Sequence, residues 1–156
     1  MQCSLLNVQT LTDKKLDILN DITQDDHISY FTEVNITSPE HLNVLTDDEV
    51  YSWKFIPKER DFQQRIAFRY PSYLKNDLRF DDLKYDYIVQ ERAQKDQCCA
   101  QFMSYRFRYK HLDYRVALVY RAPDTNAENT DLLYQKLDKV KPHLCVGDFV
   151  MAIISK

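Results

Sequence analysis

Four polar residues, far apart in the sequence, each stand where a predicted β-strand ends: Asn7, Glu33, Tyr120 and Asp148. They offer an amide, two carboxylates and a phenol. Ligand sites on layered sheets often form where strand ends converge, and polar groups at such an edge can bind a ligand and transfer protons. We therefore treat these residues as one candidate site, which requires that the fold bring all four strand ends to one rim of the sheet.

The C-terminal third of the chain has to position Tyr120 and Asp148, and its pattern is that of a strand–helix–strand unit. Residues 115–120 are β-branched and apolar, which predicts a buried strand that ends at the tyrosine. Apolar residues then recur at helical spacing over 127–141, with acidic residues early and lysines late, as the helix dipole favours. The short apolar strand 144–146 leads directly to the aspartate.

A second strand–helix–strand unit, near the N-terminus, has to position Asn7 and Glu33. Predicted strands at 4–8 and 28–32 flank an amphipathic helix at 11–23. Such a unit favours two neighbouring parallel strands, which place their C-terminal ends on the same edge of a sheet. We therefore expect the Asn7 and Glu33 side chains to converge.

Between these units the sequence predicts a loop and a set of antiparallel strands. Residues 35–48 are polar and lack periodicity, which is typical of a loop over a strand edge. The other expected elements are paired strands at 50–55 and 65–69, a loop with one helical turn at 71–83, and a meander of strands at 85–90, 99–110 and 115–119.

The length and composition indicate one globular domain, residues 1–156. The order of the expected strands and helices indicates the α+β class, with a mixed β-sheet and helices on its outer face. A net charge of −3 argues against nucleic-acid binding through bulk charge but allows a local basic patch. The four cysteines lack metal-ligand spacing, and we find no signal peptide and no segment that could span a bilayer. We expect an intracellular protein, in the cytoplasm or nucleus, that is neither secreted nor bound to a membrane.

One basic strand has two interpretations. Over 105–110 aromatic and cationic residues alternate, so that Arg106, Arg108 and Lys110 share one face. With Arg121 they could follow a nucleic-acid backbone. The alternative, which we favour, is an aromatic core face beneath a solvated outer face.

Four short motifs, in order, resemble the endonuclease/exonuclease/phosphatase superfamily, which has the deoxyribonuclease-I-like fold. They are N-V-Q-T-L at 7–11, an apolar strand ending in T-E at 30–33, Y-R-A-P at 120–123 and G-D-F at 147–149. The likeness is closest to the endonuclease domain of LINE-type (non-LTR) retrotransposons and covers only the first part of such a domain. It implies the first half of a two-sheet α/β sandwich. One apolar sheet face would then need a cover, from the run 149–154, a partner or a second copy, and we expect self-association.

The resemblance also implies roles for the four residues. Glu33 would bind Mg²⁺ (or Mn²⁺), with Asn7 and Asp148 completing the metal site. Tyr120 would contact the scissile phosphate, and Asp148 would orient the attacking water. Each residue also has a simpler interpretation. Glu33 would be a solvated carboxylate, Asn7 and Asp148 would be turn residues, and Tyr120 would be a strand-end aromatic.

Two departures from the family pattern bear on activity. Val150 stands where the family has an asparagine, so a hydrogen bond to the phosphate is lost. The family's closing S-D-H motif supplies a histidine as general acid or base. No residue matches it after Asp148, and the four histidines, at positions 27, 41, 111 and 143, all precede it.

The leading hypothesis is a metal-dependent phosphodiester hydrolase that acts on DNA, an endonuclease-type domain of retrotransposon origin with impaired turnover. The alternative is a non-catalytic remnant that binds nucleic acid or protein, which the two departures favour. A transposon fragment without a selected role is a third interpretation.

Overall fold

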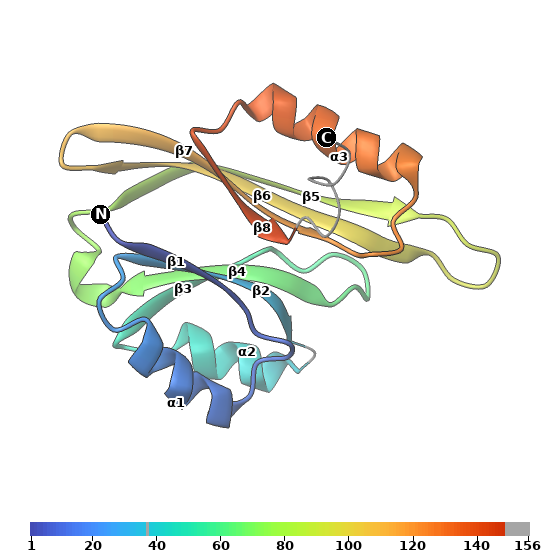
Figure 1. Cartoon of the computed structure of the whole chain (residues 1–156). Helices are drawn as coiled ribbons and strands as arrows, with labels where there is room; N and C mark the ends of the chain where they lie inside the picture. The colour runs from blue at the N-terminus through green and yellow to red at the C-terminus, as the bar shows by residue number, and fades with distance from the viewer. Residues whose placement is uncertain (37, 149–156) are drawn as a thin grey trace.

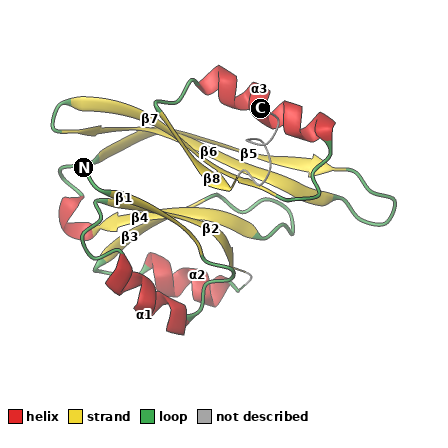
Figure 2. Cartoon of the chain, in the orientation of Figure 1, coloured by secondary structure: helices red, strands yellow, loops and turns green. Residues whose placement is uncertain are grey.

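Two β-sheets pack face to face, and helices cover their outer faces (Figures 1 and 2). The computed structural model describes residues 1–36 and 38–148. The first sheet has the order β1-β2-β4-β3, formed by β1 (Cys3–Asn7), β2 (Ile28–Ile36), β4 (Gln64–Pro71) and β3 (Tyr51–Phe55). The second has the order β5-β6-β7-β8, formed by β5 (Arg79–Gln90), β6 (Gln97–Tyr109), β7 (Leu112–Arg121) and β8 (Leu144–Asp148).

Helices α1 (Asp13–Ile22) and α2 (Pro39–Thr46) lie against the first sheet, and α3 (Ala127–Val140) lies against the second (Figure 1). A short 3₁₀ helix, η1 (Ser72–Leu74), follows β4. The predicted parallel units are confirmed, because β1 pairs with β2 and β7 pairs with β8 in parallel. No helix in the described residues is long and apolar enough to cross a membrane.

The main core lies between the sheets and is rich in aromatic rings. Phe68 of β4 stacks on Tyr105 of β6 with ring centroids 4.5 Å apart. The Tyr105 hydroxyl donates a hydrogen bond of 2.6 Å to the hydroxyl of Tyr30 on β2, and both side chains are buried. Apolar side chains of β7, including Val116 and Leu118, complete this layer. The aromatic residues that alternate with cations over 105–110 therefore face this core.

The second sheet corrects the expectation of an uncovered sheet face. That expectation is wrong, because β5 to β8 come from the same chain and cover the inner face of the first sheet. The reason given for self-association is thereby removed. The run 149–154, proposed as a cover, and Val150 lie outside the described residues.

Two loop predictions are also wrong. Within 35–48 the chain forms α2, which Ser38 caps by accepting a hydrogen bond of 3.1 Å from the His41 N–H, with Pro39 in the first turn. Within 71–83 the expected helical turn is present as η1, but the chain enters β5 at Arg79, so the end of this stretch is strand and not loop.

Gly147 is the one glycine of the sequence, and its position requires a glycine. Its φ is +153°, and a Cβ built there would lie 2.0 Å from the Val119 carbonyl oxygen. Gly147 and Val119 face each other on β8 and β7. The absence of a side chain therefore allows β8 to approach β7 and to bring the next residue, Asp148, to the end of the sheet.

We expect Gly147→Ala to lower the free energy of unfolding by about 2–4 kcal/mol, because the methyl group would collide with backbone atoms. Urea denaturation measures this change. Cys145→Ala, at an exposed residue of the same strand, is the matched control and should stay within about 0.5 kcal/mol. Equal stability of the two variants would contradict the steric role of Gly147.

The buried hydroxyl pair gives a second stability prediction. Tyr105→Phe should lower the free energy of unfolding by about 1–3 kcal/mol, because the Tyr30 hydroxyl would remain buried without a hydrogen-bond partner. Adding Tyr30→Phe should recover part of that loss. Urea denaturation of both single variants and the double variant measures the coupling. Strictly additive losses would show that the two hydroxyls do not stabilise each other.

Candidate active site

The structure brings three of the four candidate side chains into direct contact. The Asn7 amide nitrogen donates a hydrogen bond to the Glu33 carboxylate and another, of 3.2 Å, to the Asp148 carboxylate. Asn7 and Glu33 belong to the first sheet, and Asp148 ends the edge strand of the second. One amide therefore joins the two sheets at the rim where β1, β2 and β8 meet (Figure 1).

Glu33 lies in a bulge of β2. The regular pairing of β2 with β4 stops at Thr32 and resumes at Ile36, so residues 33–35 face the single residue Arg65. A bulge redirects side chains, and bulges are frequent beside active sites. Here the bulge turns the β2 backbone at Glu33, whose carboxylate accepts the hydrogen bond from Asn7.

The backbone of this bulge is left-handed at two residues. Glu33 has a φ of +55° and Asn35 a φ of +52°. Such conformations cost on the order of 1–3 kcal/mol each unless the surroundings enforce them. The loop after β1 supplies this constraint, because the Thr10 and Leu11 N–H groups donate hydrogen bonds of 2.8 and 2.9 Å to the carbonyls of Glu33 and Val34.

Tyr120, the fourth candidate, lies opposite Asp148 on the neighbouring parallel strand. Its side chain is buried, and burial raises the pKa of the phenol. The Arg65 guanidinium opposes this rise in pKa, and the Glu33 and Asp148 carboxylates add to it. The phenol therefore stays protonated at neutral pH and can donate a hydrogen bond.

The Asp148 carboxylate has a raised pKa. Burial is the largest cause, the negative charge of Glu33 adds to the rise in pKa, and the hydrogen bond from Asn7 opposes it. A carboxylate with a raised pKa is a better proton acceptor than an ordinary aspartate. The site thus pairs two like charges and moderates their repulsion with one amide.

Two further residues of the site escaped the sequence analysis. Arg65 of β4 lies with its guanidinium carbon 5.4 Å from the centre of the Tyr120 ring. Gln101 of β6 is fully buried directly across from Tyr120. Its amide oxygen accepts a hydrogen bond of 2.7 Å from the Arg65 N–H. The sequence contains one signal for Gln101: it is a polar residue on a strand face whose other members are apolar, which is unusual for a position that faces the core.

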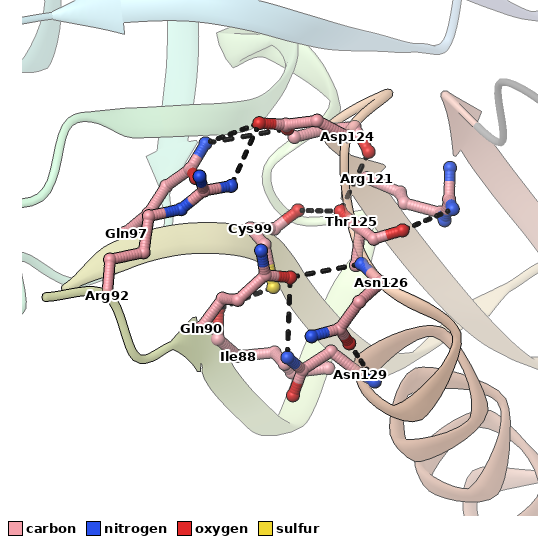
Figure 3. A network of polar contacts seen from close by, with 11 residues as sticks. Ile88, Gln90, Arg92, Gln97, Cys99, Arg121, Asp124, Thr125, Asn126 and Asn129 are labelled. Atoms are coloured by element: carbon pink, nitrogen blue, oxygen red, sulfur yellow. Dashed lines mark hydrogen bonds and ion pairs between the residues drawn. The ribbon is translucent and has the colours of Figure 1, made fainter.

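The loop after Tyr120 is fastened to β5 and β6 by the polar network in Figure 3. The Thr125 hydroxyl donates a hydrogen bond of 3.0 Å to the Cys99 carbonyl. The Asn126 N–H donates another of 3.0 Å to the Gln90 side chain. These bonds fix the end of β7, and with it the position of the phenol.

Arg121 belongs to this network and is only 2% exposed. Its guanidinium donates hydrogen bonds of 3.0 Å to the Thr130 hydroxyl and 3.1 Å to the Thr125 carbonyl. The expectation that Arg121 contacts nucleic acid is wrong, because its side chain faces the interior beneath α3 rather than solvent.

The other basic candidates lie away from the site, at the opposite end of β6 from Gln101. Arg106 pairs with Asp81, with a nitrogen–oxygen distance of 3.1 Å, and Arg108 pairs with Asp113 at 2.9 Å. Lys110 stands in the turn after β6. These aspartates neutralise the two arginines, and the arrangement matches the interpretation of a solvated outer face that we favoured.

The donor set of the site fits a hard divalent cation. Mg²⁺ prefers oxygen ligands and is commonly held by one or two carboxylates, with water and phosphate oxygens completing its shell. Glu33 and Asp148 supply two carboxylates joined by the Asn7 amide. The Asn7 oxygen accepts a hydrogen bond of 3.1 Å from the Gln9 N–H, so it faces the backbone in this arrangement. Among the described residues, no group of three acidic, histidine or cysteine side chains gathers as a preformed cage.

No protein-family model matches the sequence, and no curated protein matches it significantly. Solved structures do match. The human Nocturnin catalytic domain is 14% identical, with a TM-score of 0.63, over 96% of this chain and 63% of that one. A Bacteroides thetaiotaomicron mannosyl-6-phosphatase is 12% identical, with a TM-score of 0.64, over 94% of this chain and 63% of that one.

The endonuclease domain of TRAS1, a telomere-specific non-LTR retrotransposon, is 12% identical, with a TM-score of 0.56. The match covers 92% of this chain and 58% of that one. This chain therefore spans about 60% of the length of the structures that it resembles. Over that length it has the deoxyribonuclease-I-like fold, with two mixed sheets and outer helices, that occurs in endonuclease/exonuclease/phosphatase proteins.

Proposed function

We propose that this chain is a metal-dependent phosphodiester hydrolase that acts on DNA, an endonuclease-type domain of retrotransposon origin. The observation that carries the proposal is the Asn7 amide held between the Glu33 and Asp148 carboxylates. Tyr120 lies opposite Asp148 on the neighbouring strand. The fold alone would support phosphatase and nuclease chemistry equally. The likeness to a retrotransposon endonuclease domain and the motif order favour DNA.

In this proposal Glu33 and Asp148 hold the Mg²⁺ (or Mn²⁺) ion, which when bound supplies positive charge against the charge developing on the phosphate. Tyr120 donates its phenolic hydrogen bond to a phosphate oxygen. Asn7 supports the metal site, because its amide nitrogen donates to both carboxylates and orients them. Asp148 accepts a hydrogen bond from the attacking water and orients it, a role that its raised pKa suits.

We propose that turnover is slow, because no histidine stands at the site in the described residues. His27 lies against Tyr109, and His143 accepts a hydrogen bond from the Arg115 N–H. His41 lies in α2, and His111 lies in the turn after β6. A missing general base typically costs about 10²–10⁴-fold in rate. The same observation favours the second candidate function, a non-catalytic module that binds nucleic acid or a protein.

A plasmid-nicking assay separates the two candidates. With Mg²⁺ the purified chain should convert supercoiled plasmid slowly to the open circle, and EDTA should stop the reaction. Glu33→Gln and Asp148→Asn should each lower the rate at least about 100-fold, because each removes a charge that acts on the phosphate or the water.

Glu49→Gln is the matched control, since Glu49 is an exposed carboxylate outside the site. Its nicking rate should equal that of the unmodified chain. Nicking that persists in both site variants would refute the assignment of the site. DNA binding without metal-dependent nicking would favour the non-catalytic module.

The raised pKa of Asp148 predicts that Asp148→Asn stabilises the fold at neutral pH. At pH 7 the ionised carboxylate is less favourable in the folded than in the unfolded protein. Asparagine removes that cost and can still accept the Asn7 hydrogen bond. The melting temperature at pH 7 should rise by about 1–3 °C, a small amount because the group is only partly buried.

The sign can be checked by thermal scans at several pH values. Below the ordinary aspartate pKa of 3.8, both the folded and the unfolded protein carry the proton. The stabilising difference should therefore shrink to zero as the pH falls through the raised pKa and below 3.8. A variant that melts below the unmodified chain at pH 7 would show that the charge at Asp148 is favourable.

A further inference from the structure

Arg65 is a cation at the rim of the site whose charge no carboxylate neutralises in the described part of the chain. Four other arginines, at positions 60, 92, 106 and 108, each pair with an aspartate at 3.4 Å or less. Arg65 instead donates a hydrogen bond of 2.5 Å to the amide oxygen of Asn35. A neutral partner orients the guanidinium and leaves its charge available for an anion.

The backbone of Arg65 is fixed from two sides. It is the one residue of β4 that faces the β2 bulge bearing Glu33. Its N–H donates to Gln101, a buried side chain of the other sheet whose amide nitrogen in turn donates to the Gln63 carbonyl at 2.5 Å. Arg65 therefore stands at the junction of the two sheets, as the carboxylate pair does.

The guanidinium also lies against Tyr120, the residue opposite Asp148. Its charge acts on the phenol, because it opposes the rise in the pKa of Tyr120. A substrate phosphate that meets the phenol therefore comes within reach of this cation. The charges of Glu33 and Asp148 repel an anion, so a cation beside Tyr120 would offset that repulsion.

An open pocket of about 190 Å³ is lined by Arg65, Tyr120 and Gln101, and also by Asp61 and Lys95, which pair with each other. A water molecule in the liquid occupies about 30 Å³. The pocket thus has room for a phosphate-sized anion and gives the guanidinium a path from solvent.

We propose that Arg65 binds the non-bridging oxygens of the substrate's phosphate group, so that the site takes phosphate esters between this cation and the carboxylate pair. A guanidinium presents paired donors that match two phosphate oxygens. The proposal rests on the proposed function for its substrate class. The anion binding itself is a property of the chain that can be measured without catalysis.

The test is a titration with inorganic phosphate, without divalent metal and at an ionic strength of about 0.15 M, where distant surface charges are screened. Binding is monitored by the ¹H–¹⁵N NMR signals of the backbone and arginine side chains. The unmodified chain should show saturable shifts at Arg65 and its neighbours. Arg65→Gln should weaken phosphate binding at least roughly tenfold, because a charge-assisted, two-donor contact is lost. Arg65→Lys should retain part of the phosphate affinity, since lysine keeps the positive charge but lacks the paired donors of the guanidinium.

Arg79→Gln is the matched control, because it removes the same charge from an exposed position at the start of β5. Its phosphate affinity should stay within about twofold of the unmodified chain, as expected for a screened surface charge. The proposal is overturned if a folded Arg65→Gln variant binds phosphate as tightly as Arg79→Gln, or if the unmodified chain shows no saturable phosphate shifts. Failure of the proposed function would appear separately, as an absence of metal-dependent nicking while phosphate still binds at Arg65.

Discussion

The apolar layer between the two sheets is the interaction on which the site depends. Each sheet is a separate hydrogen-bonded unit, so the packing of their facing side chains sets how the sheets lie against each other. The candidate site takes two residues from each sheet. Aromatic contacts such as that of Phe68 with Tyr105 therefore decide, at a distance, whether an amide on β1 reaches a carboxylate on β8. The chemistry at the rim depends on the fit of the core.

The rim also concentrates features that destabilise a fold. Glu33 and Asn35 adopt left-handed backbone conformations, and Gly147 permits a contact that no other residue allows. Asp148 is partly buried beside another carboxylate, which raises its pKa. Strained backbones and unfavourable charges that surrounding contacts enforce are typical of functional sites. Their occurrence at one rim supports the proposed active site.

The polar groups behind the rim have a supporting role. Gln101 connects the two sheets through the backbones of Arg65 and Gln63, and the network around Thr125 holds the end of β7. Such supports restrict the side chains of the candidate site to a narrow range of geometries. The same fold occurs in a mannosyl-6-phosphatase and in an endonuclease domain, so the architecture by itself does not identify a substrate.

Local patterns in the sequence determined the two strand–helix–strand units and the meeting of their strand ends, because periodicity and parallel pairing act over short stretches of chain. The helix within the polar stretch 35–48 was not predicted. Its apolar face is small, and packing of that face on the first sheet stabilises the helix. Nothing in the local sequence separates the roles of Arg121 and Arg65. In the structure Arg121 is buried beneath α3, whereas Arg65 faces the bulge of β2. Tertiary structure alone decided this, because strand register and sheet packing join residues that the sequence separates by dozens of positions.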